Sequence, residues 1–304
     1  MSKFVNVASM LFEQEHLCDH PDAGNLVFNE TRQRLDDLKG LKLDLVVLSE
    51  GVEAVGQKIE DAEELTKPGR YLKLYADFAV SEKCHVAGSL KVREGTKVYN
   101  SIVFIDPKGK PVGAYHKNNL TIGEIECGLS PGKDACVVDT AIGRIGGAIC
   151  FDLNFEYLRK KYVALKPDIM IFSSMFHGGF VQRIWAYECR AFLVAALQIH
   201  GGGILDPLGT IISLTDCYNK TAIARINLDR AIVHLDYNRD KFQEIIRKYG
   251  DDIKICIPEN LGSAIVYSKT DKMTAKHIVS EFELELLDTY LARAEKVNSE
   301  KRSI

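Results

Sequence analysis

The amino-acid sequence predicts a mixed α/β fold whose sheets are covered by helices. Two observations support this prediction. Short apolar runs alternate with stretches of helical spacing along most of the chain, which is typical of strands and helices that follow one another. Several runs are apolar at successive positions, as expected for strands that are buried on both faces. With 304 residues, 46% of them hydrophobic, the chain can bury the core that such a layered fold needs.

The expected elements follow one another in a regular order. The strands are the start "MSKFVNVASMLFEQEH", "LDLVVLSE", "HVAGSLKV", a hairpin "YNSIVFIDPKGKPVGAYHK" that turns at "DPKGKP", "GRIGGAIC" and "DIMIFSS". The helices are "RYLKLYADFAVSEKC", "FEYLRKKYVAL" and "VQRIWAYECRAF", each with apolar residues on one face. The segment "DPLGT" reads as a turn between two further strands.

The pattern changes near residue 240, which predicts a main domain over residues 1–240 and an α/β extension over residues 241–304. The extension begins with the amphipathic helix "KFQEIIRKYG", which Gly250 is expected to cap. Two short strands, "IKICIP" and "GSAIVYS", come next. A single helix is then expected around "VSEFELELLDTYLARAEKV", with Val279, Phe282, Leu286 and Tyr290 on one stripe. The extension carries no chemical constellation, so we expect it to pack on the main domain or on another subunit.

Composition excludes several classes of partner. The formal net charge is −3 and no block of like charge occurs, which argues against nucleic-acid binding. No stretch approaches the roughly 20 apolar residues of a membrane helix, and the start lacks the pattern of a secretory leader. We therefore expect a cytoplasmic protein that binds neither nucleic acid nor membrane.

The eight cysteines are scattered and form no C-x-x-C pair, which argues against a zinc or redox-pair site. They are Cys18, Cys84, Cys127, Cys136, Cys150, Cys189, Cys217 and Cys256. In a reducing compartment most of them are expected to be free, small core residues. We therefore expect no metal at the site.

Cys150 stands apart by its position in "GGAICFDLNFEYL", where a strand ends and a helix is expected to begin. The partial positive charge of a helix N-terminus favours a thiolate, although a buried cysteine at a strand end is the alternative. A nucleophilic cysteine needs a base, which is usually a histidine. The candidates, none at a signature spacing, are His116, His177, His200 and His234. A cysteine–histidine pair therefore stays open.

Two other predicted strands also end in a reactive group. Glu50 ends "LVVLSE", and Lys117 ends the hairpin in "GAYHK". A carboxylate in an apolar pocket can accept the thiol proton, and a lysine can lower the pKa of the thiol and stabilise an oxyanion. Taken alone, a glutamate or a lysine at such a position is more often an ordinary surface charge.

With their flanks, these three positions resemble the carbon–nitrogen hydrolase (nitrilase) superfamily. The resemblance covers about residues 1–235 and rests on "LVVLSE", the hairpin with "KNNL", "ECGLSPGKDACVVDTAIGRIGGAICFD" and "DPLGT". It implies a four-layer α-β-β-α sandwich that forms a homodimer or a higher homo-oligomer and uses no cofactor. It also implies Glu50 as base, Lys117 as oxyanion stabiliser and Cys150 as nucleophile, with the N–H of Phe151 completing the oxyanion hole.

The same resemblance implies further site residues. The family often has a second glutamate before the "PG" turn, and Glu126 in "ECGLSPG" matches best, with Glu124 as its rival. The segment "SSMFHGGF" is expected to line the pocket, so Phe176 and His177 are candidate substrate contacts. His177 could instead cap the next helix.

Phe151 and Asp152 after the cysteine match the Cys-x-Asp pattern of the amidase and carbamoylase branches, whereas true nitrilases usually carry Trp-Glu. Leu153 and Asn154 stand where relatives that act on carboxylates often place arginine, and "RAFLVAAL" replaces the usual "RAxEN" of the later helix. We predict a thiol amidohydrolase of a small amide or carbamoyl compound. The alternatives are a nitrilase or an acyl or amide transferase on the same triad, and an inactive binding or scaffold subunit.

Overall fold

The computed structural model describes residues 4–14, 17, 20–53 and 58–303, so Cys18 and parts of the predicted first strand lie outside the described residues. The chain divides into two compact units, residues 1–226 and 227–304. This division falls earlier than the predicted boundary after residue 240. The reason is strand pairing, because β13 (Arg230–His234) pairs antiparallel with β15 (Ser263–Ser268) inside the second unit.

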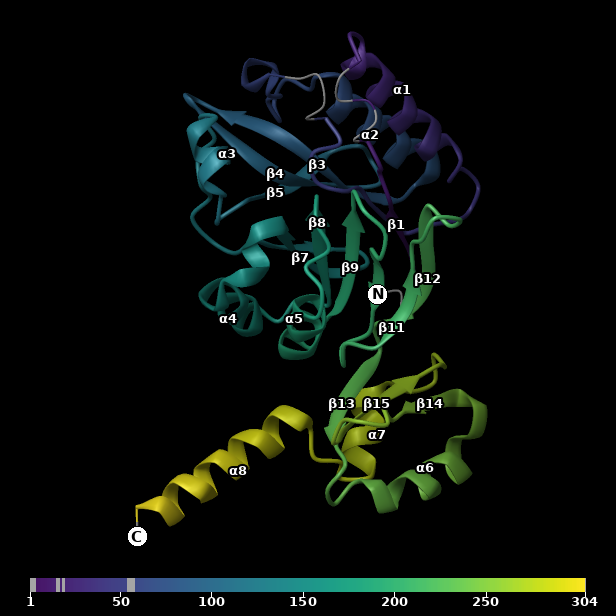
Figure 1. Cartoon of the computed structure of the whole chain (residues 1–304). Coiled ribbons are helices and arrows are strands. Elements are labelled where there is room, and N and C mark those ends of the chain that lie inside the picture. The colour runs from purple at the N-terminus through teal and green to yellow at the C-terminus, as the bar shows by residue number, and fades with distance from the viewer. Residues whose placement is uncertain (1–3, 15–16, 18–19, 54–57, 304) are drawn as a thin grey trace. The chain divides into compact units, whose positions relative to one another are not determined.

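Two six-stranded sheets form the first unit (Figure 1). The first sheet has the order β12-β1-β2-β3-β4-β5, and the second has the order β11-β10-β9-β8-β7-β6. The strands of the first sheet are β1 (Phe4–Met10), β2 (Leu45–Val47), β3 (His85–Glu94), β4 (Lys97–Ile105), β5 (Pro111–His116) and β12 (Thr221–Asn227). Those of the second sheet are β6 (Val137–Thr140), β7 (Gly143–Ile149), β8 (Ile169–Ser174), β9 (Phe192–Leu197), β10 (Gly203–Leu205) and β11 (Ile211–Leu214).

Each sheet combines a parallel centre with antiparallel neighbours. The strands β1, β2 and β3 run parallel, and so do β7, β8 and β9. The predicted hairpin is the antiparallel pair of β4 and β5. The carboxyl ends of parallel strands lie at one edge of a sheet, where side chains of several strands can meet.

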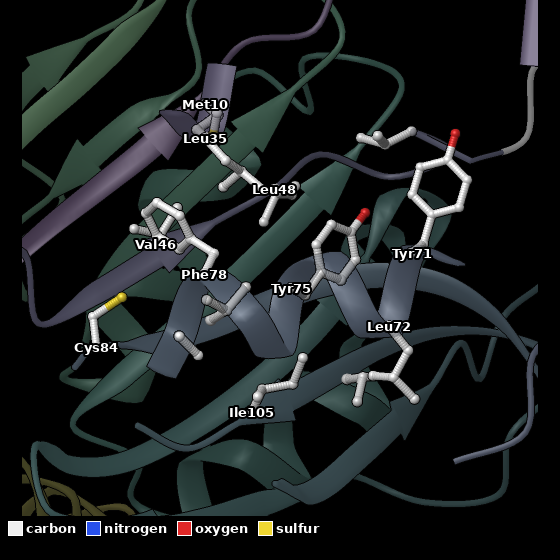
Figure 2. Packing of buried hydrophobic residues seen from close by; sticks show 14 of the residues in the cluster. Met10, Leu35, Val46, Leu48, Tyr71, Leu72, Tyr75, Phe78, Cys84 and Ile105 are labelled. Atoms are coloured by element: carbon white, nitrogen blue, oxygen red, sulfur yellow. The ribbon is translucent and has the colours of Figure 1, made fainter. Parts of the chain in front are cut away.

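Helices cover the outer face of each sheet. The helices α1 (Ala23–Asp36) and α2 (Arg70–Glu82) cover the first sheet. Figure 2 shows part of the buried cluster that joins them, in which Tyr75 and Phe78 of α2 lie close to Val46 and Leu48. The second sheet is covered by α4 (Glu156–Leu165) and α5 (Val181–Cys189).

The inner faces of the two sheets pack together, so the first unit has four layers. The hydroxyl of Ser173 on β8 crosses between them and donates to the carbonyl of Leu48, at 2.8 Å. The predicted four-layer α-β-β-α sandwich is therefore confirmed. Among the described helices, none is both long and apolar enough to cross a bilayer.

The described part of the second unit is a three-stranded sheet, of order β13-β15-β14, with three α-helices and two short 3-10 helices. Its remaining strand is β14 (Ile253–Cys256), its α-helices are α6 (Phe242–Tyr249), α7 (Ala275–Glu281) and α8 (Leu287–Arg302), and its 3-10 helices are η4 (Arg239–Lys241) and η5 (Gly250–Asp252). The prediction of one helix around residues 279–297 is wrong. The chain turns at Glu283, whose backbone is left-handed (φ 48°), and this break lets Leu284 reach the buried core of the unit.

The segment "RAFLVAAL" also differs from expectation, because it does not continue a helix. Arg190 ends α5 in a left-handed conformation (φ 53°), and Phe192 then begins β9. Every residue of β9 is buried. The segment therefore supplies a central strand of the second sheet.

Candidate active site

Strands of both sheets deliver the candidate residues to one place. Glu50 follows β2, Lys117 follows β5 and Cys150 follows β7. Ser174 is the last residue of β8 and lies beside Cys150, because Ile149 of β7 pairs in register with Ser173. Glu50 is 3% exposed and Lys117 is 1% exposed. The three residues predicted from strand ends are therefore brought together, and two of them are almost fully enclosed.

The backbone at Cys150 turns sharply out of the strand. Cys150 begins a short 3-10 helix, η3 (Cys150–Asn154), and has a left-handed φ of 48°. A non-glycine residue adopts this conformation at a cost of order 1 kcal/mol or more. The helix α4 begins only at Glu156, so Cys150 does not lie at its N-terminus as the sequence suggested. The left-handed turn is what lifts the side chain from the strand.

The ammonium group of Lys117 joins two carboxylates. Its Nζ lies 2.9 Å from Oε1 of Glu50 and 2.9 Å from both carboxylate oxygens of Glu124. Glu124 lies in α3 (Ile122–Glu126), where it also forms a capping box with Thr121. Burial alone would lower the pKa of Lys117, but the charges of Glu50 and Cys150 and the bonds to Glu124 outweigh burial and raise it. Lys117 is therefore a cation throughout the neutral range.

Glu124 carries the second negative charge of the cluster. Burial opposes its ionisation, yet the hydrogen bonds from Lys117 and from the backbone of Thr121 lower its pKa below the usual value. Both carboxyl groups thus face one cation, and the arrangement favours a strongly held lysine rather than a mobile one.

The thiol of Cys150 is held in its protonated form. Burial, followed by the charge of Glu50, raises the pKa of Cys150 to about 12, while Lys117 and a hydrogen bond with Ser174 act in the opposite direction. The hydroxyl of Ser174 accepts a bond from the N–H of Phe176, at 3.0 Å, which leaves its own hydrogen available for the sulfur. A neutral thiol beside a carboxylate is suited to attack with simultaneous proton transfer.

Three contacts that the sequence analysis missed hold Glu50. The amide of Asn100 donates to Glu50 Oε1 at 2.8 Å and to Glu124 Oε1 at 3.0 Å. The N–H of Met175 donates to Glu50 Oε2 at 3.0 Å, and the Gln198 side chain donates to the backbone carbonyl of Glu50 at 2.7 Å. Asn100 had a visible signal, since it is a polar residue inside the apolar strand "VYNSIVFI". The other two contacts had none.

The structure corrects the choice of the second glutamate. Glu126 is exposed, whereas Glu124, its rival, contacts Lys117 from one side of α3. Two positions apart on a helix correspond to a rotation of about 200° around its axis, so the two side chains lie on nearly opposite sides. Only one of them can face the lysine.

The segment after β8 places its predicted contacts at the surface. Phe176 is 40% exposed. The ring nitrogen Nδ1 of His177 accepts a hydrogen bond from the N–H of Gly179 at 3.0 Å. The backbone carbonyl of His177 accepts one from the side-chain amide of Gln182 in α5. His177 also lines a cavity of about 340 Å³ together with Phe180 and others, and Cys150 is not among the lining residues. Contact of Phe176 and His177 with substrate stays a prediction.

The other candidate histidine bases have partners elsewhere. His116 contacts the Ser101 hydroxyl at 2.7 Å and Glu94 at 3.1 Å. His200 pairs with Glu13, and His234 stacks on a tyrosine ring. The side chains that act most strongly on Cys150 in the described part of the chain are Glu50, Lys117 and Ser174, so the geometry favours a carboxylate base over a cysteine–histidine pair.

The four-layer α-β-β-α sandwich and the grouping of Glu50, Lys117 and Cys150 agree with the class that the sequence resemblance implied, the hydrolases of carbon–nitrogen bonds other than peptide bonds. The family model described as carbon-nitrogen hydrolase matches residues 31–233. The chain belongs to the carbon–nitrogen hydrolase family.

The sequence is similar to those of several curated proteins, including the following three. A hydrolase of Schizosaccharomyces pombe is 27% identical over 171 residues, 48% of this chain and 52% of the relative. The deaminated glutathione amidase of Bos taurus is 26% identical over 222 residues, 61% and 67% of the two chains. The chloroplastic omega-amidase of Arabidopsis thaliana is 22% identical over 224 residues, 64% and 58%. The chain spans about half the length of the first of these relatives.

Solved structures show the same fold. Nit3 of Saccharomyces cerevisiae, from branch 10 of the nitrilase superfamily, superposes with a TM-score of 0.65 at 19% identity, over 81% of this chain and 95% of that one. An amidase from Nesterenkonia sp. superposes with a TM-score of 0.63 at 14% identity, over 82% and 98%.

Proposed function

We propose that the protein is a thiol amidohydrolase that cleaves the C–N bond of a small amide or carbamoyl compound. Cys150 is the nucleophile, Glu50 the general base and Lys117 the oxyanion stabiliser. The observation that carries the proposal is the cluster itself, in which Lys117 Nζ lies 2.9 Å from Glu50 and acts to lower the pKa of the Cys150 thiol, against the effects of burial and of Glu50. The predicted cytoplasmic location and homo-oligomeric state are part of the same proposal.

In the first half-reaction, Glu50 takes the thiol proton as the sulfur attacks the carbonyl carbon, because the thiol is protonated at neutral pH. A C–S bond forms and the carbonyl oxygen becomes an oxyanion, which Lys117 and the N–H of Phe151 stabilise. When the C–N bond breaks, Glu50 returns the proton to the leaving nitrogen. Ammonia or an amine departs and a thioester remains.

In the second half-reaction, Glu50 accepts a proton from water as the oxygen attacks the thioester carbon. The C–S bond breaks, the acid product leaves and the proton returns to the sulfur. Glu50 is fixed for both steps by Asn100 and the N–H of Met175. Glu124 holds Lys117 through its two carboxylate oxygens, so that the ammonium group points where charge develops.

Three observations support an amide or carbamoyl substrate. Cys150 is followed by Phe151 and Asp152, the pattern of the amidase branches. Two of the relatives are named as amidases, and a mutant of the Nesterenkonia amidase carries the acetamide moiety of fluoroacetamide on its active-site cysteine. The Asn154 side chain, where relatives often have arginine, donates to the carbonyl of Phe151 at 3.0 Å and offers no charge to a substrate carboxylate, which argues against an N-carbamoyl amino acid among these substrates.

Release of ammonia tests the proposal. The purified protein would be incubated with panels of small amides, carbamoyl compounds and nitriles, with and without hydroxylamine as acceptor. We expect hydrolysis of amides or carbamoyl compounds in preference to nitriles, and complete loss of activity in Cys150→Ala. Nitriles that outcompete every amide would overturn the branch assignment, and a Cys150 that forms no adduct with any substrate would favour the scaffold alternative.

A second test addresses the base. We expect Glu50→Gln to lose at least roughly 100-fold in hydrolysis, because general-base catalysis is removed. The same variant should alkylate faster with iodoacetamide, since the charge of Glu50 raises the pKa of the thiol and its removal increases the thiolate fraction. His177→Ala tests the rival cysteine–histidine pair and should retain kcat, since loss of a substrate contact would change KM instead. Loss of hydrolysis in His177→Ala but not in Glu50→Gln would reverse the assignment.

A further inference from the structure

Asp152 is completely buried, and donors occupy both of its carboxylate oxygens. Oδ2 accepts the hydroxyl of Tyr115 at 2.7 Å and the N–H of Ile149 at 3.0 Å. Oδ1 accepts the backbone N–H of Asn119 at 2.8 Å and its side-chain amide at 2.9 Å. Burial raises the pKa of Asp152, and these four donors oppose that rise. These four hydrogen-bond partners are all donors, which is the environment that a carboxylate requires.

In the sequence, Asp152 and the residues that donate to it flank two proposed catalytic residues. Tyr115 and Asn119 stand two positions before and two positions after Lys117, while Ile149 and Asp152 stand on either side of Cys150. One carboxylate therefore ties the segment that carries the lysine to the turn that carries the cysteine. We name Tyr115, Asn119, Ile149 and Asp152 the carboxylate clamp.

Neighbouring contacts reinforce the clamp. The backbone N–H and the side chain of Asn118 both donate to the Tyr115 hydroxyl, at 3.3 and 3.2 Å. The hydroxyl of Tyr157 donates to the side-chain oxygen of Asn119 at 2.8 Å. The partners of Asp152 are thus themselves held, and the carboxylate has little room to follow a shift of either segment.

We propose that Asp152 is a positioning residue that sets the separation between Lys117 Nζ and Cys150 Sγ. The inference deepens the proposed function and rests on it. The separation decides how strongly the ammonium group stabilises negative charge on the sulfur and on the oxyanion. Asp152 would then influence the reaction without touching the substrate, and the aspartate of the Cys-x-Asp pattern would have a geometric role.

Two substitutions alter the clamp in different ways. Asp152→Asn keeps the length of the side chain but replaces one carboxylate oxygen, an acceptor, by an NH2 group, a donor. The two N–H or O–H donors that faced that oxygen then lose their acceptor. Asp152→Glu keeps the charge and both acceptors but adds one methylene in a fully buried position. If only charge mattered, glutamate would restore function. If spacing matters, both variants are impaired.

The experiment measures the rate at which iodoacetamide alkylates Cys150 in the full-length protein at pH 8, by mass spectrometry of the Cys150 peptide, together with kcat and KM for an amide. In both variants we expect alkylation to slow roughly tenfold, the effect of one pKa unit on the thiolate fraction. We expect kcat to fall about 100-fold and KM to change little.

Asp168→Asn is the matched control. Asp168 also accepts a backbone N–H, that of Arg144 at 3.0 Å, but it precedes β8 at the end opposite to Ser174. The control should lose stability without a change in alkylation. Unchanged alkylation and kcat in Asp152→Asn would overturn the proposal. Where Asp152→Asn fails to fold, Tyr115→Phe removes a single donor and should slow alkylation in the same direction, and an unchanged rate there would also refute the clamp.

The alkylation comparison needs no substrate. A wild-type protein that hydrolyses no amide would therefore contradict the proposed function, while the clamp would still be decided by the reactivity of Cys150.

Discussion

At the scale of single residues, Cys150 combines a left-handed backbone with a thiol that stays protonated. Cysteine nucleophiles are commonly activated as thiolates by a neighbouring cation. Here Lys117 favours the thiolate, but burial and the charge of Glu50 prevail. In the proposed mechanism, the reactivity of this thiol therefore depends on proton transfer to Glu50 during attack, rather than on a thiolate that is already present.

The two glutamates of α3 give a residue-level prediction. Glu124→Gln should lower kcat roughly 10- to 100-fold, because hydrogen bonds to a charged group contribute about 1.5–3 kcal/mol and Lys117 would lose an anionic partner. Glu126→Gln, on the exposed side of the same helix, is the control and should leave kcat unchanged. Steady-state kinetics on an amide checks both variants. Equal losses in the two would argue that Glu124 serves only the stability of α3.

Much of the candidate site could be predicted from local patterns. Glu50, Lys117 and Cys150 each end a predicted strand, the family resemblance assigned them their roles, and the fold brings these strand ends together. The choice between Glu124 and Glu126 had a signal that was overlooked, because Thr121 and Glu124 have the spacing of a capping box. The contacts from Met175 and Gln198 could not be predicted, since they lie 125 and 148 residues from Glu50 in the sequence.

At the scale of elements, the turn around Gly132 supports the lysine segment. The N–H of Gly132 donates to the carbonyl of Lys117 at 2.7 Å. A Cβ atom at Gly132 would lie 2.2 Å from the carbonyl oxygen of His116. Only glycine fits this close approach of two backbones without a shift.

Gly132→Ala should therefore destabilise the protein by about 1–3 kcal/mol, the usual cost of overpacking, and should lower kcat because the lysine segment moves. Urea denaturation and amide kinetics provide the two measurements. Gly123→Ala in α3 is the control, since nothing lies within 4 Å of a Cβ atom there. A Gly132→Ala protein as stable as this control would show that the turn can move freely.

The misassigned elements have physical causes. The run "FLVAAL" is short and wholly apolar, and such a run does not separate a buried strand from a buried helix. The long apolar stripe near the C-terminus kept its helical spacing through Glu283, where tertiary packing of Leu284 breaks the helix. Strands with clear turns beside them, such as β4 and β5, were predicted well because the turn residues marked their ends.

At the scale of the whole molecule, the chain contains two units with separate hydrophobic cores. Ile278→Ala in α7 should destabilise the second unit by about 2–5 kcal/mol through loss of a buried side chain. Hydrogen exchange should show reduced protection in β15, with β8 and the alkylation rate of Cys150 unchanged. Lys276→Ala, an exposed substitution on the same helix, is the control. Equal loss of protection in β8 would show that the units unfold together.

The long sequence separations around Glu50 also bear on biosynthesis. The carbonyl of Glu50 is bound by the side chain of Gln198, 148 residues further on. At roughly 5–20 residues per second, a ribosome needs about 7–30 s to add that span. Glu50 and Cys150 are both made before Ser174, Met175 and Gln198, so for part of synthesis the thiol and the carboxylate exist without the groups that hold them. The proposed active site can therefore be completed only after Gln198 has been added to the chain.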